Sequence, residues 1–196
     1  MNVIALASLN RGKLEEFQAL FSRHNVRLVG FDSFVRNAGH LGKVESRLPS
    51  ATYGENSRRK CVAAFSAAKV PTVADDSGLE VDALNGEPGV HSAQSSPRKI
   101  LDALKGKQNR KARMRCVLTF LMEGLAVTAE GVVEGRIADR ETGTGGFGYD
   151  AIFIPEAGDG RTFAQMLPEE KNALSHRAKA VDALAGKIQD FELVRP

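Results

Sequence analysis

Tryptophan is absent from the 196-residue sequence, and aromatic residues of all kinds make up only 6% of it. Cysteine is scarce as well. Cys61 and Cys116 lie far apart and lack the spacing of metal ligands, so the simplest interpretation is two free thiols in a reducing compartment. No apolar run is long enough to cross a membrane, and the apolar start at 3–7 precedes its basic residues, whereas a signal peptide carries them first. These absences predict a soluble, cytoplasmic protein.

The rest of the composition is that of an ordinary globular protein, with 42% hydrophobic and 26% charged residues. The length favours a single domain over residues 1–196, with enough chain for a sizeable core and for two lobes. The net charge of +3 is too small to indicate a nucleic-acid binder, but it would not repel a small polyanion.

One segment is strongly basic. Between Lys105 and Arg115 the chain has six basic residues and no acidic residue. The segment has no interleaved aromatic residues, which single-strand binders usually have. We interpret it as a solvated face, with general nucleic-acid affinity as the alternative.

Hydrophobic patterns alternate between strand-like and helix-like segments, which predicts an α/β fold. Strands are expected at 3–7, 26–29, 70–74, 79–84, 116–122, 127–137 and 151–154. Helices are expected from Leu14 to Phe21, from an N-cap at Thr52 to about Lys69, and around Val181, Leu184 and Ile188.

Two adjacent carboxylates, Asp75 and Asp76, end the apolar run 70–74 and are followed by Ser77 and Gly78. Successive side chains of a strand face opposite sides, so only one carboxylate can point into a given cleft. A carboxylate beside a hydroxyl suits Mg²⁺, which binds one or two carboxylates together with phosphate oxygens. Asp-Ser-Gly is also ordinary turn chemistry, with Gly78 as a sharp exit from the strand, and these residues alone leave both interpretations open.

The first loop contains Ser8, Asn10, Gly12 and Lys13 between a strand and a helix. Backbone N–H groups and the helix dipole at such a place favour an anion, and the lysine adds a full charge. The spacing is not that of a Walker A loop, and a polar connection with a solvated lysine is the alternative.

The second helix carries Glu55 within pairing distance of Arg58 and Arg59, which predicts surface ion pairs. Lys60 borders the buried stripe of this helix. It could reach a phosphate or it could extend its ammonium group to solvent, and the sequence does not decide between these.

A glycine-rich segment, 143–150, carries Phe147, Tyr149 and Asp150. Its glycines would let the backbone approach a ligand, and the two aromatic rings offer faces for stacking a base. A hairpin tip whose aromatic residues fill the core is the alternative.

The segment 171–177 has two interpretations. In one continuous helix Lys171 and His176 would point in different directions and could not easily share a ligand. If Ser175 is instead an N-cap, His176 and Arg177 occupy the first turn of the last helix, and their donors aim at one place. A surface His-Arg pair remains the alternative.

Four sequence blocks occur together in an order that resembles the Ham1-like inosine triphosphate pyrophosphatase family, which hydrolyses noncanonical purine nucleoside triphosphates. The likeness covers roughly residues 3–185. The blocks are 74–84 (ADDSGLEVDAL), 88–90 (PGV), 145–150 (GGFGYD), and 168–172 (PEEKN) with 175–177 (SHR).

The resemblance implies a two-lobed single α/β domain with a central mixed, twisted β-sheet flanked by helices and a nucleotide cleft between the lobes. It also implies a homodimer that converts ITP, dITP and XTP to the monophosphate and pyrophosphate with Mg²⁺, with no nucleic-acid partner. By the same likeness Asp76 is the proton acceptor and a metal ligand, Lys60 assists at the phosphates, and Asp75 supports Asp76 from the opposite face.

The remaining roles are also implied by the resemblance. The triphosphate would be held by Ser8, Asn10, Gly12, Lys13 and Ser77. The base pocket would be formed by Phe147, Gly148, Tyr149, Asp150, Lys171, His176 and Arg177. Glu45 or Glu55 would complete the metal site.

The sequence departs from the family pattern at Leu9, at Gln94, at Ala151 and in the missing acidic pair before the second helix. Two other functions therefore stay open. One is a nucleotide pyrophosphatase or phosphatase with a different base preference, and the other is a non-catalytic nucleotide- or RNA-binding module that uses the segment 105–115.

Overall fold

The computed structural model describes residues 3–35 and 51–189. The strands are β1 (Val3–Leu6), β2 (Arg27–Gly30), β3 (Thr72–Val81), β4 (Lys111–Met122), β5 (Leu125–Ile137) and β6 (Phe153–Pro155). The helices are α1 (Arg11–Ser22), α3 (Tyr53–Ala68), α4 (Pro97–Ala103), α5 (Pro168–Leu174) and α6 (His176–Gln189). Short 3₁₀ turns are η1 (Phe31–Ser33), η2 (Asp82–Leu84), η3 (Gly89–Gln94) and η4 (Phe163–Gln165). Within the described ranges no helix is both long and apolar enough to cross a membrane.

The strands form one sheet in the order β2-β1-β3-β4-β5-β6. Strand β1 pairs in parallel with β2 and with β3, where Ala5 lies opposite Thr72. Strand β6 pairs antiparallel with β5, where Arg136 lies opposite Ile154. The predicted α/β fold with a mixed sheet flanked by helices is therefore confirmed.

The chain divides into two compact units. Unit 1 consists of Met1–Asp76, Cys116–Gly131 and Ala180–Pro196, and unit 2 consists of Ser77–Arg115 and Val132–Lys179. Strands β3, β4 and β5 each contain residues of both units.

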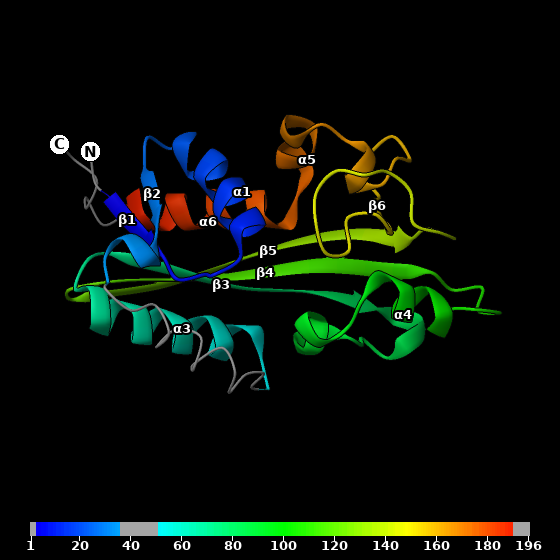
Figure 1. The fold of residues 1–196 in the computed structure, drawn as a ribbon, viewed down its shortest axis with the longest axis horizontal. Coiled ribbons are helices and arrows are strands. Elements are labelled where there is room, and N and C mark those ends of the chain that lie inside the picture. Colours follow the sequence, from blue (N-terminus) through cyan, green and yellow to red (C-terminus); the bar gives the residue numbers. More distant parts are fainter. Residues whose placement is uncertain (1–2, 36–50, 190–196) are drawn as a thin grey trace. The chain divides into compact units, whose positions relative to one another are not determined.

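In unit 1, α1 and α6 cover one face of the strands and α3 covers the other (Figure 1). His24 Nε2 and Asp182 Oδ1 are 2.8 Å apart and join the turn after α1 to α6. Cys61 on α3 lies in a small buried cluster with Ala64 and Ala74, and burial raises the pKa of its thiol to about 12. Cys61 and Cys116 are both free thiols, as predicted.

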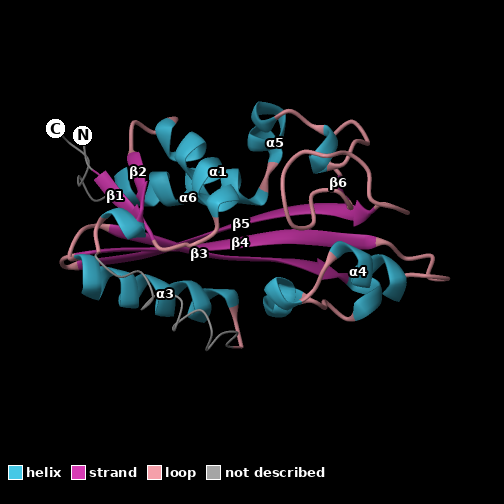
Figure 2. Ribbon diagram, in the orientation of Figure 1, coloured by secondary structure: helices cyan, strands magenta, loops and turns pink. Residues whose placement is uncertain are grey.

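Unit 2 has its own hydrophobic core, to which β3, β4, β5 and η4 all contribute. Its largest fully buried members include Leu79, Ile137, Ile152, Phe153 and Phe163. Figure 2 shows the connection from β5 to β6 as loop rather than helix. This loop contains the glycine-rich segment, whose Tyr149 packs against the core of unit 2.

The sharp exit expected at Gly78 is wrong, and with it the turn interpretation of Asp-Ser-Gly, because β3 continues through Ser77 and Gly78 to Val81. Leu79 and Val81 are completely buried in the core of unit 2, and the Leu79 N–H donates to Ser92 Oγ at 2.9 Å. Burial on both sides of the Asp-Ser-Gly sequence therefore overrides its turn propensity. The chain turns only after η2, where Asn85 and Gly86 have the predicted turn conformation, with φ of 55° and 86°.

The segment 105–115 is a solvated face only in part. Lys105, Lys107 and Lys111 are exposed, but β4 begins at Lys111 and four of the six basic side chains have partners within unit 2. The pairs are Lys105 with Asp102, Arg110 with the Ile137 and Ala138 carbonyls, Arg113 with Asp82 and Glu134, and Arg115 with Glu80. Acidic partners offset the charge of Lys105, Arg113 and Arg115, while Lys107 and Lys111 stay exposed. The positive charge of the segment is therefore reduced but not removed, and nucleic-acid binding stays an alternative.

Candidate functional site

Strand β3 places Asp75 and Asp76 on opposite faces, as the strand periodicity predicts. The Asp75 side chain is fully buried on the α1 side, where its Oδ2 lies 2.6 Å from Lys13 Nζ. The Asp76 side chain faces α3 and keeps 17% of its surface exposed. Asp76 is therefore the carboxylate of the pair that a ligand can reach. We refer to these two residues with Lys13, Asn56 and Lys60 as the Asp76 cluster.

Two side chains of α3 hold the Asp76 carboxylate. Asn56 Nδ2 donates to its Oδ2 at 2.9 Å, and Lys60 Nζ lies 3.7 Å from its Oδ1. Burial raises the pKa of Asp76 above the ordinary value, although the charge of Lys60 and the hydrogen bond from Asn56 oppose this shift. A carboxylate that has lost much of its water in this way attracts a proton or a cation.

Local interactions explain why α3 presents Asn56 and Lys60 together. The side chain of Thr52 accepts the Glu55 N–H at 3.1 Å, which confirms the predicted N-cap. Ser57 Oγ and Thr119 Oγ1, both buried, are 2.7 Å apart and fix the helix against β4. Asn56 and Lys60 are four residues apart and therefore share one face of the helix.

In the first loop, the side chains that were predicted to bind an anion accept hydrogen bonds from the backbone of the loop itself. Asn10 is the N-cap of α1 and accepts the Lys13 N–H at 3.0 Å, and Ser8 Oγ accepts the Asn10 N–H at 3.2 Å. Gly12 lies in the first turn of α1. The Lys13 side chain is 18% exposed although its ammonium group pairs with the fully buried Asp75.

The residues of the Asp76 cluster fit a magnesium ion in part. Mg²⁺ is usually bound by one or two carboxylates, with phosphate oxygens and waters completing its shell. Asp76 is such a carboxylate. Glu55 is exposed and pairs with Arg59 at 2.6 Å, while Glu45 lies outside the described residues. Among residues 3–35 and 51–189 no three His, Cys, Asp or Glu side chains are grouped as metal ligands.

A second group of candidate residues lies in unit 2. Asp150 Oδ2 accepts the Phe147 N–H at 2.8 Å and lies 2.7 Å from Lys171 Nζ. The side chains of Asp150 and Lys171 are buried, so this ion pair holds the glycine-rich loop to α5. Gly146 and Gly148 have φ of 67° and 62°, a conformation that glycine adopts without strain.

The ring of Phe147 lies beside two cations. Lys171 Nζ is 5.0 Å and Arg177 Cζ is 4.8 Å from its centroid, both within the range of a cation–π interaction. Ser175 separates α5 from α6 and accepts the Ala178 N–H at 3.1 Å, so of the two interpretations of this segment the one with Ser175 as an N-cap is confirmed. We call Phe147, Asp150, Lys171 and Arg177 the Phe147 cluster.

Three other predicted residues lie in unit 2. His176 is buried in the first turn of α6, and Ser77 follows Asp76 in β3. Tyr149 packs partly against the core of unit 2, and its hydroxyl donates to the Ser92 carbonyl at 2.8 Å. This contact ties the glycine-rich loop to η3, and it agrees with the alternative in which an aromatic residue of this loop fills the core. A stacking role for Tyr149 stays a prediction.

Sequence reasoning missed Asn56. The residue is 1% exposed and its amide contacts a carboxylate twenty positions further along the chain. Its one local signal is its position four residues before Lys60 on the same helical face.

Comparison with known proteins adds to this geometry. Residues 4–187 match the Ham1 family. A dITP/XTP pyrophosphatase of Methylococcus capsulatus is 40% identical over 95% of this chain and 96% of its own length.

Two solved structures are similar to this chain. A HAM1 protein from Coxiella burnetii has a TM-score of 0.78 and 32% identity, covering 97% of this chain and 100% of that one. A nucleoside-triphosphatase, dITP/XTP pyrophosphatase, from Mycobacterium abscessus has a TM-score of 0.67 and 34% identity, covering 93% of this chain and 98% of that one.

The matched residues include both the Asp76 cluster and the Phe147 cluster, and they extend over nearly the whole chain. The mixed sheet and the two clusters thus occur in a chain that belongs to the Ham1 family.

Proposed function

We propose that this protein hydrolyses the noncanonical purine nucleoside triphosphates ITP, dITP and XTP to the nucleoside monophosphate and pyrophosphate. The observation that carries the proposal is the Asp76 carboxylate, which is partly exposed, has a raised pKa and is held by an amide and an ammonium group. The names of the Methylococcus and Mycobacterium relatives support the same activity. Elimination of these nucleotides from the nucleotide pool would be the cellular role.

Asp76 would act as a general base on water. Its carboxylate is desolvated by burial and oriented by Asn56, and it would accept the proton of the attacking water. The water oxygen would bond to the α-phosphorus, its proton would pass to Asp76, and the bond from the α-phosphorus to the bridging oxygen would break. Lys13 and Lys60 would offset the charge that develops on the departing pyrophosphate.

Asp76 would also hold a divalent ion, Mg²⁺ in our proposal, together with phosphate oxygens of the substrate. A bound Mg²⁺ would supply neutralisation of phosphate charge and a lower pKa for the attacking water. Glu45 and Glu55 remain the candidates for a second carboxylate.

The Phe147 cluster would recognise the base. Lys171 and Arg177 are donors that suit the 6-oxo group of hypoxanthine or xanthine, and the amino group of adenine in the same place would leave them badly paired. The ring of Phe147 offers a stacking surface. Discrimination between the bases would therefore come from buried donors rather than from the size of the pocket.

We further propose that both units act as one domain, that the protein is a homodimer and that it works in the cytoplasm. The first proposal rests on the three strands that contain residues of both units. The other two rest on the family likeness alone, and size-exclusion chromatography with light scattering would test the dimer.

The proposed reaction can be tested by product analysis. ITP, dITP, XTP, ATP and GTP are incubated separately with the protein, with Mg²⁺ or with EDTA, and the products are resolved by anion exchange. We expect monophosphate and pyrophosphate from the first three nucleotides, and only with Mg²⁺. Comparable turnover of ATP and GTP would favour a pyrophosphatase of different base preference, and release of orthophosphate would contradict attack at the α-phosphorus.

Asn56 gives a further prediction. Replacing it with Ala removes the amide that orients Asp76, so we expect Asn56→Ala to lower kcat/KM for ITP by about tenfold. Arg58→Ala is the control, because Arg58 is an exposed residue of the same helix and belongs to neither cluster. If the kcat/KM of Asn56→Ala for ITP equals that of the control variant, Asn56 does not orient Asp76.

A further inference from the structure

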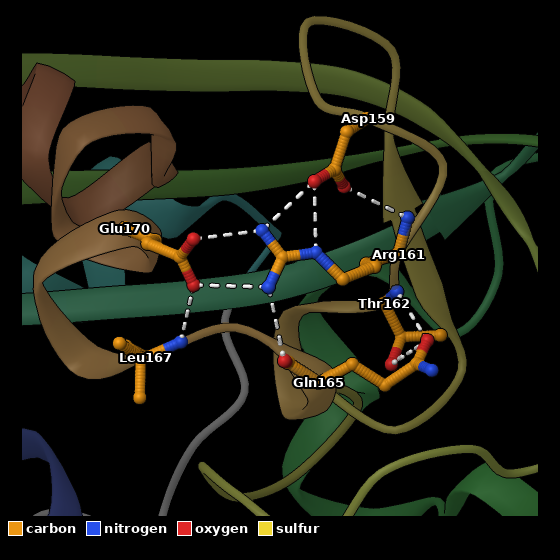
Figure 3. Close-up of polar contacts among 6 residues, drawn as sticks. All are labelled: Asp159, Arg161, Thr162, Gln165, Leu167 and Glu170. Carbon is orange, nitrogen blue, oxygen red and sulfur yellow. Dashed lines mark hydrogen bonds and ion pairs between the residues drawn. The ribbon is translucent and has the colours of Figure 1, made fainter.

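Arg161 is the centre of an ion-pair network in unit 2 (Figure 3). Its Nη1 and Nη2 donate to the two carboxylate oxygens of Glu170 at 3.0 and 2.7 Å, and its Nε donates to Asp159 Oδ2 at 2.8 Å. The hydrogen bonds from Arg161 hold the pKa of Glu170 below its ordinary value. The guanidinium group is thus fixed on two sides, and its paired contact with Glu170 has the geometry that restricts orientation most strongly.

The network acts on the first turn of α5. The oxygen of Glu170 that faces Arg161 Nη1 also accepts the Leu167 N–H at 2.7 Å, which closes the N-terminus of the helix. The next residue is Lys171, whose own N–H donates to the Leu167 carbonyl at 3.0 Å. The contacts of Glu170 therefore fix the first turn of α5, and with it the backbone position of Lys171.

The segment that follows Arg161 supports the other half of the Phe147 cluster. Thr162 Oγ1 donates to the Thr142 carbonyl at 2.7 Å, immediately before the glycine-rich loop. Ala164 accepts the Gly145 N–H at 2.9 Å and donates its own N–H to the Asp150 carbonyl at 3.1 Å. One short segment thus contacts both the loop that carries Phe147 and the helix that carries Lys171.

Stability alone does not account for this arrangement. Arg161 is 38% exposed, and exposed ion pairs contribute little to the free energy of folding. The ion pairs of Arg161 matter more for geometry than for stability. Lys171 must contact both Asp150 and the ring of Phe147, and it does so from a helix of only seven residues.

We propose that Arg161, through Glu170, is a positioning residue that sets the place of Lys171 for recognition of the purine base. The inference rests on the proposed function, since Lys171 is taken as a base-recognising donor. It extends that function by assigning part of the base specificity to residues that do not touch the substrate.

The first test needs no substrate. Hydrogen exchange of the full-length protein is compared for the wild type, for Arg161→Ala and for Arg113→Ala. Arg113 is a matched control, since it also pairs with two carboxylates in unit 2 and is 33% exposed. We expect Arg161→Ala alone to increase exchange in α5 by about tenfold or more while β4 is unaffected. Unchanged exchange in α5 would overturn the inference whatever the activity of the protein.

The second test is a double-mutant cycle on activity. We expect Arg161→Ala to raise the KM for ITP by about tenfold with kcat changed less than about twofold, and to have almost no further effect in a Lys171→Met background. Arg113→Ala should leave KM unchanged. An equal effect of Arg161→Ala with and without Lys171 would show that Arg161 does not act through that residue, and would overturn the inference.

The two tests separate the inference from the proposed function. A wild type that does not hydrolyse ITP would contradict the proposed function, while the exchange of α5 still tests the network. A wild type that does hydrolyse ITP, combined with an unaltered α5 in Arg161→Ala, would overturn the positioning role alone. If Lys171→Met does not fold, the exchange measurement remains decisive.

Discussion

Asp76→Asn is expected to abolish hydrolysis of ITP and to raise the melting temperature in the same protein. The loss of kcat should be about 10²- to 10⁴-fold, because the variant has no general base and no ionised ligand for a metal. The gain in stability follows from burial, which makes the ionised carboxylate unfavourable in the folded state and is the main cause of the raised pKa. An amide has no charge to bury and can still meet Asn56. The ion pair that is lost, with Lys60 at 3.7 Å, is long compared with the 2.6 Å pair of Asp75 with Lys13.

The pH dependence of this effect has a definite sign. A carboxyl group whose pKa is higher in the folded than in the unfolded protein stabilises the fold below the unfolded value, and this contribution is lost as pH rises through the folded value. The melting-temperature advantage of Asp76→Asn should therefore be present at neutral pH and should shrink as the solution is acidified toward the ordinary carboxyl pKa. Calorimetry at several pH values, without metal, measures it.

Asp75→Asn is the matched control. Asp75 is fully buried and its Oδ2 lies 2.6 Å from Lys13 Nζ, so its replacement should lower the melting temperature by breaking a buried ion pair. If Asp76→Asn is less stable than the wild type, burial of this charge is not the dominant cost. If it keeps more than about a tenth of the activity, Asp76 is not the general base.

The second large effect is expected from Gly146→Ala. A Cβ at Gly146 would overlap the carboxylate of Asp150, which already contacts the Phe147 N–H and Lys171. The residue also has φ of 67°, which adds backbone strain for alanine. We expect a loss of about 2–4 kcal/mol in the free energy of unfolding, together with a raised KM for ITP. Urea unfolding and steady-state kinetics measure the two effects.

Gly148 provides an internal control two residues away. Its φ of 62° imposes similar strain on alanine, but a Cβ there would lie more than 4 Å from every described residue other than its chain neighbours. Gly148→Ala should therefore cost only about 1–2 kcal/mol. Equal losses for the two variants would mean that backbone conformation, and not the contact with Asp150, decides the requirement for glycine at position 146.

Features determined by neighbouring residues were predictable from the sequence. The N-caps at Thr52 and Ser175 depend on hydrogen bonds three residues along the chain, at 3.1 Å in both cases. The opposite orientation of Asp75 and Asp76 follows from the strand period alone. For the segment 171–177 the local rules offered the observed break between α5 and α6 as one of two interpretations.

Features that depend on distant parts of the chain were not predictable. Asp-Ser-Gly favours a turn locally, but the burial of Leu79 and Val81 keeps it extended. Arg113 looked like a solvated charge because its partner Asp82 lies thirty-one residues away. The role of Asn56 was hidden for the same reason, since its contact with Asp76 exists only in the folded chain.

One competition measurement tests the central proposal most directly. dITP, dATP and dGTP are mixed in equal amounts with the protein and Mg²⁺, and all products are followed over time. The proposed function predicts that dIMP and pyrophosphate form first, with kcat/KM for dITP exceeding that for dATP by at least about 100-fold. Consumption of the three nucleotides at similar rates, or release of orthophosphate in place of pyrophosphate, would contradict it.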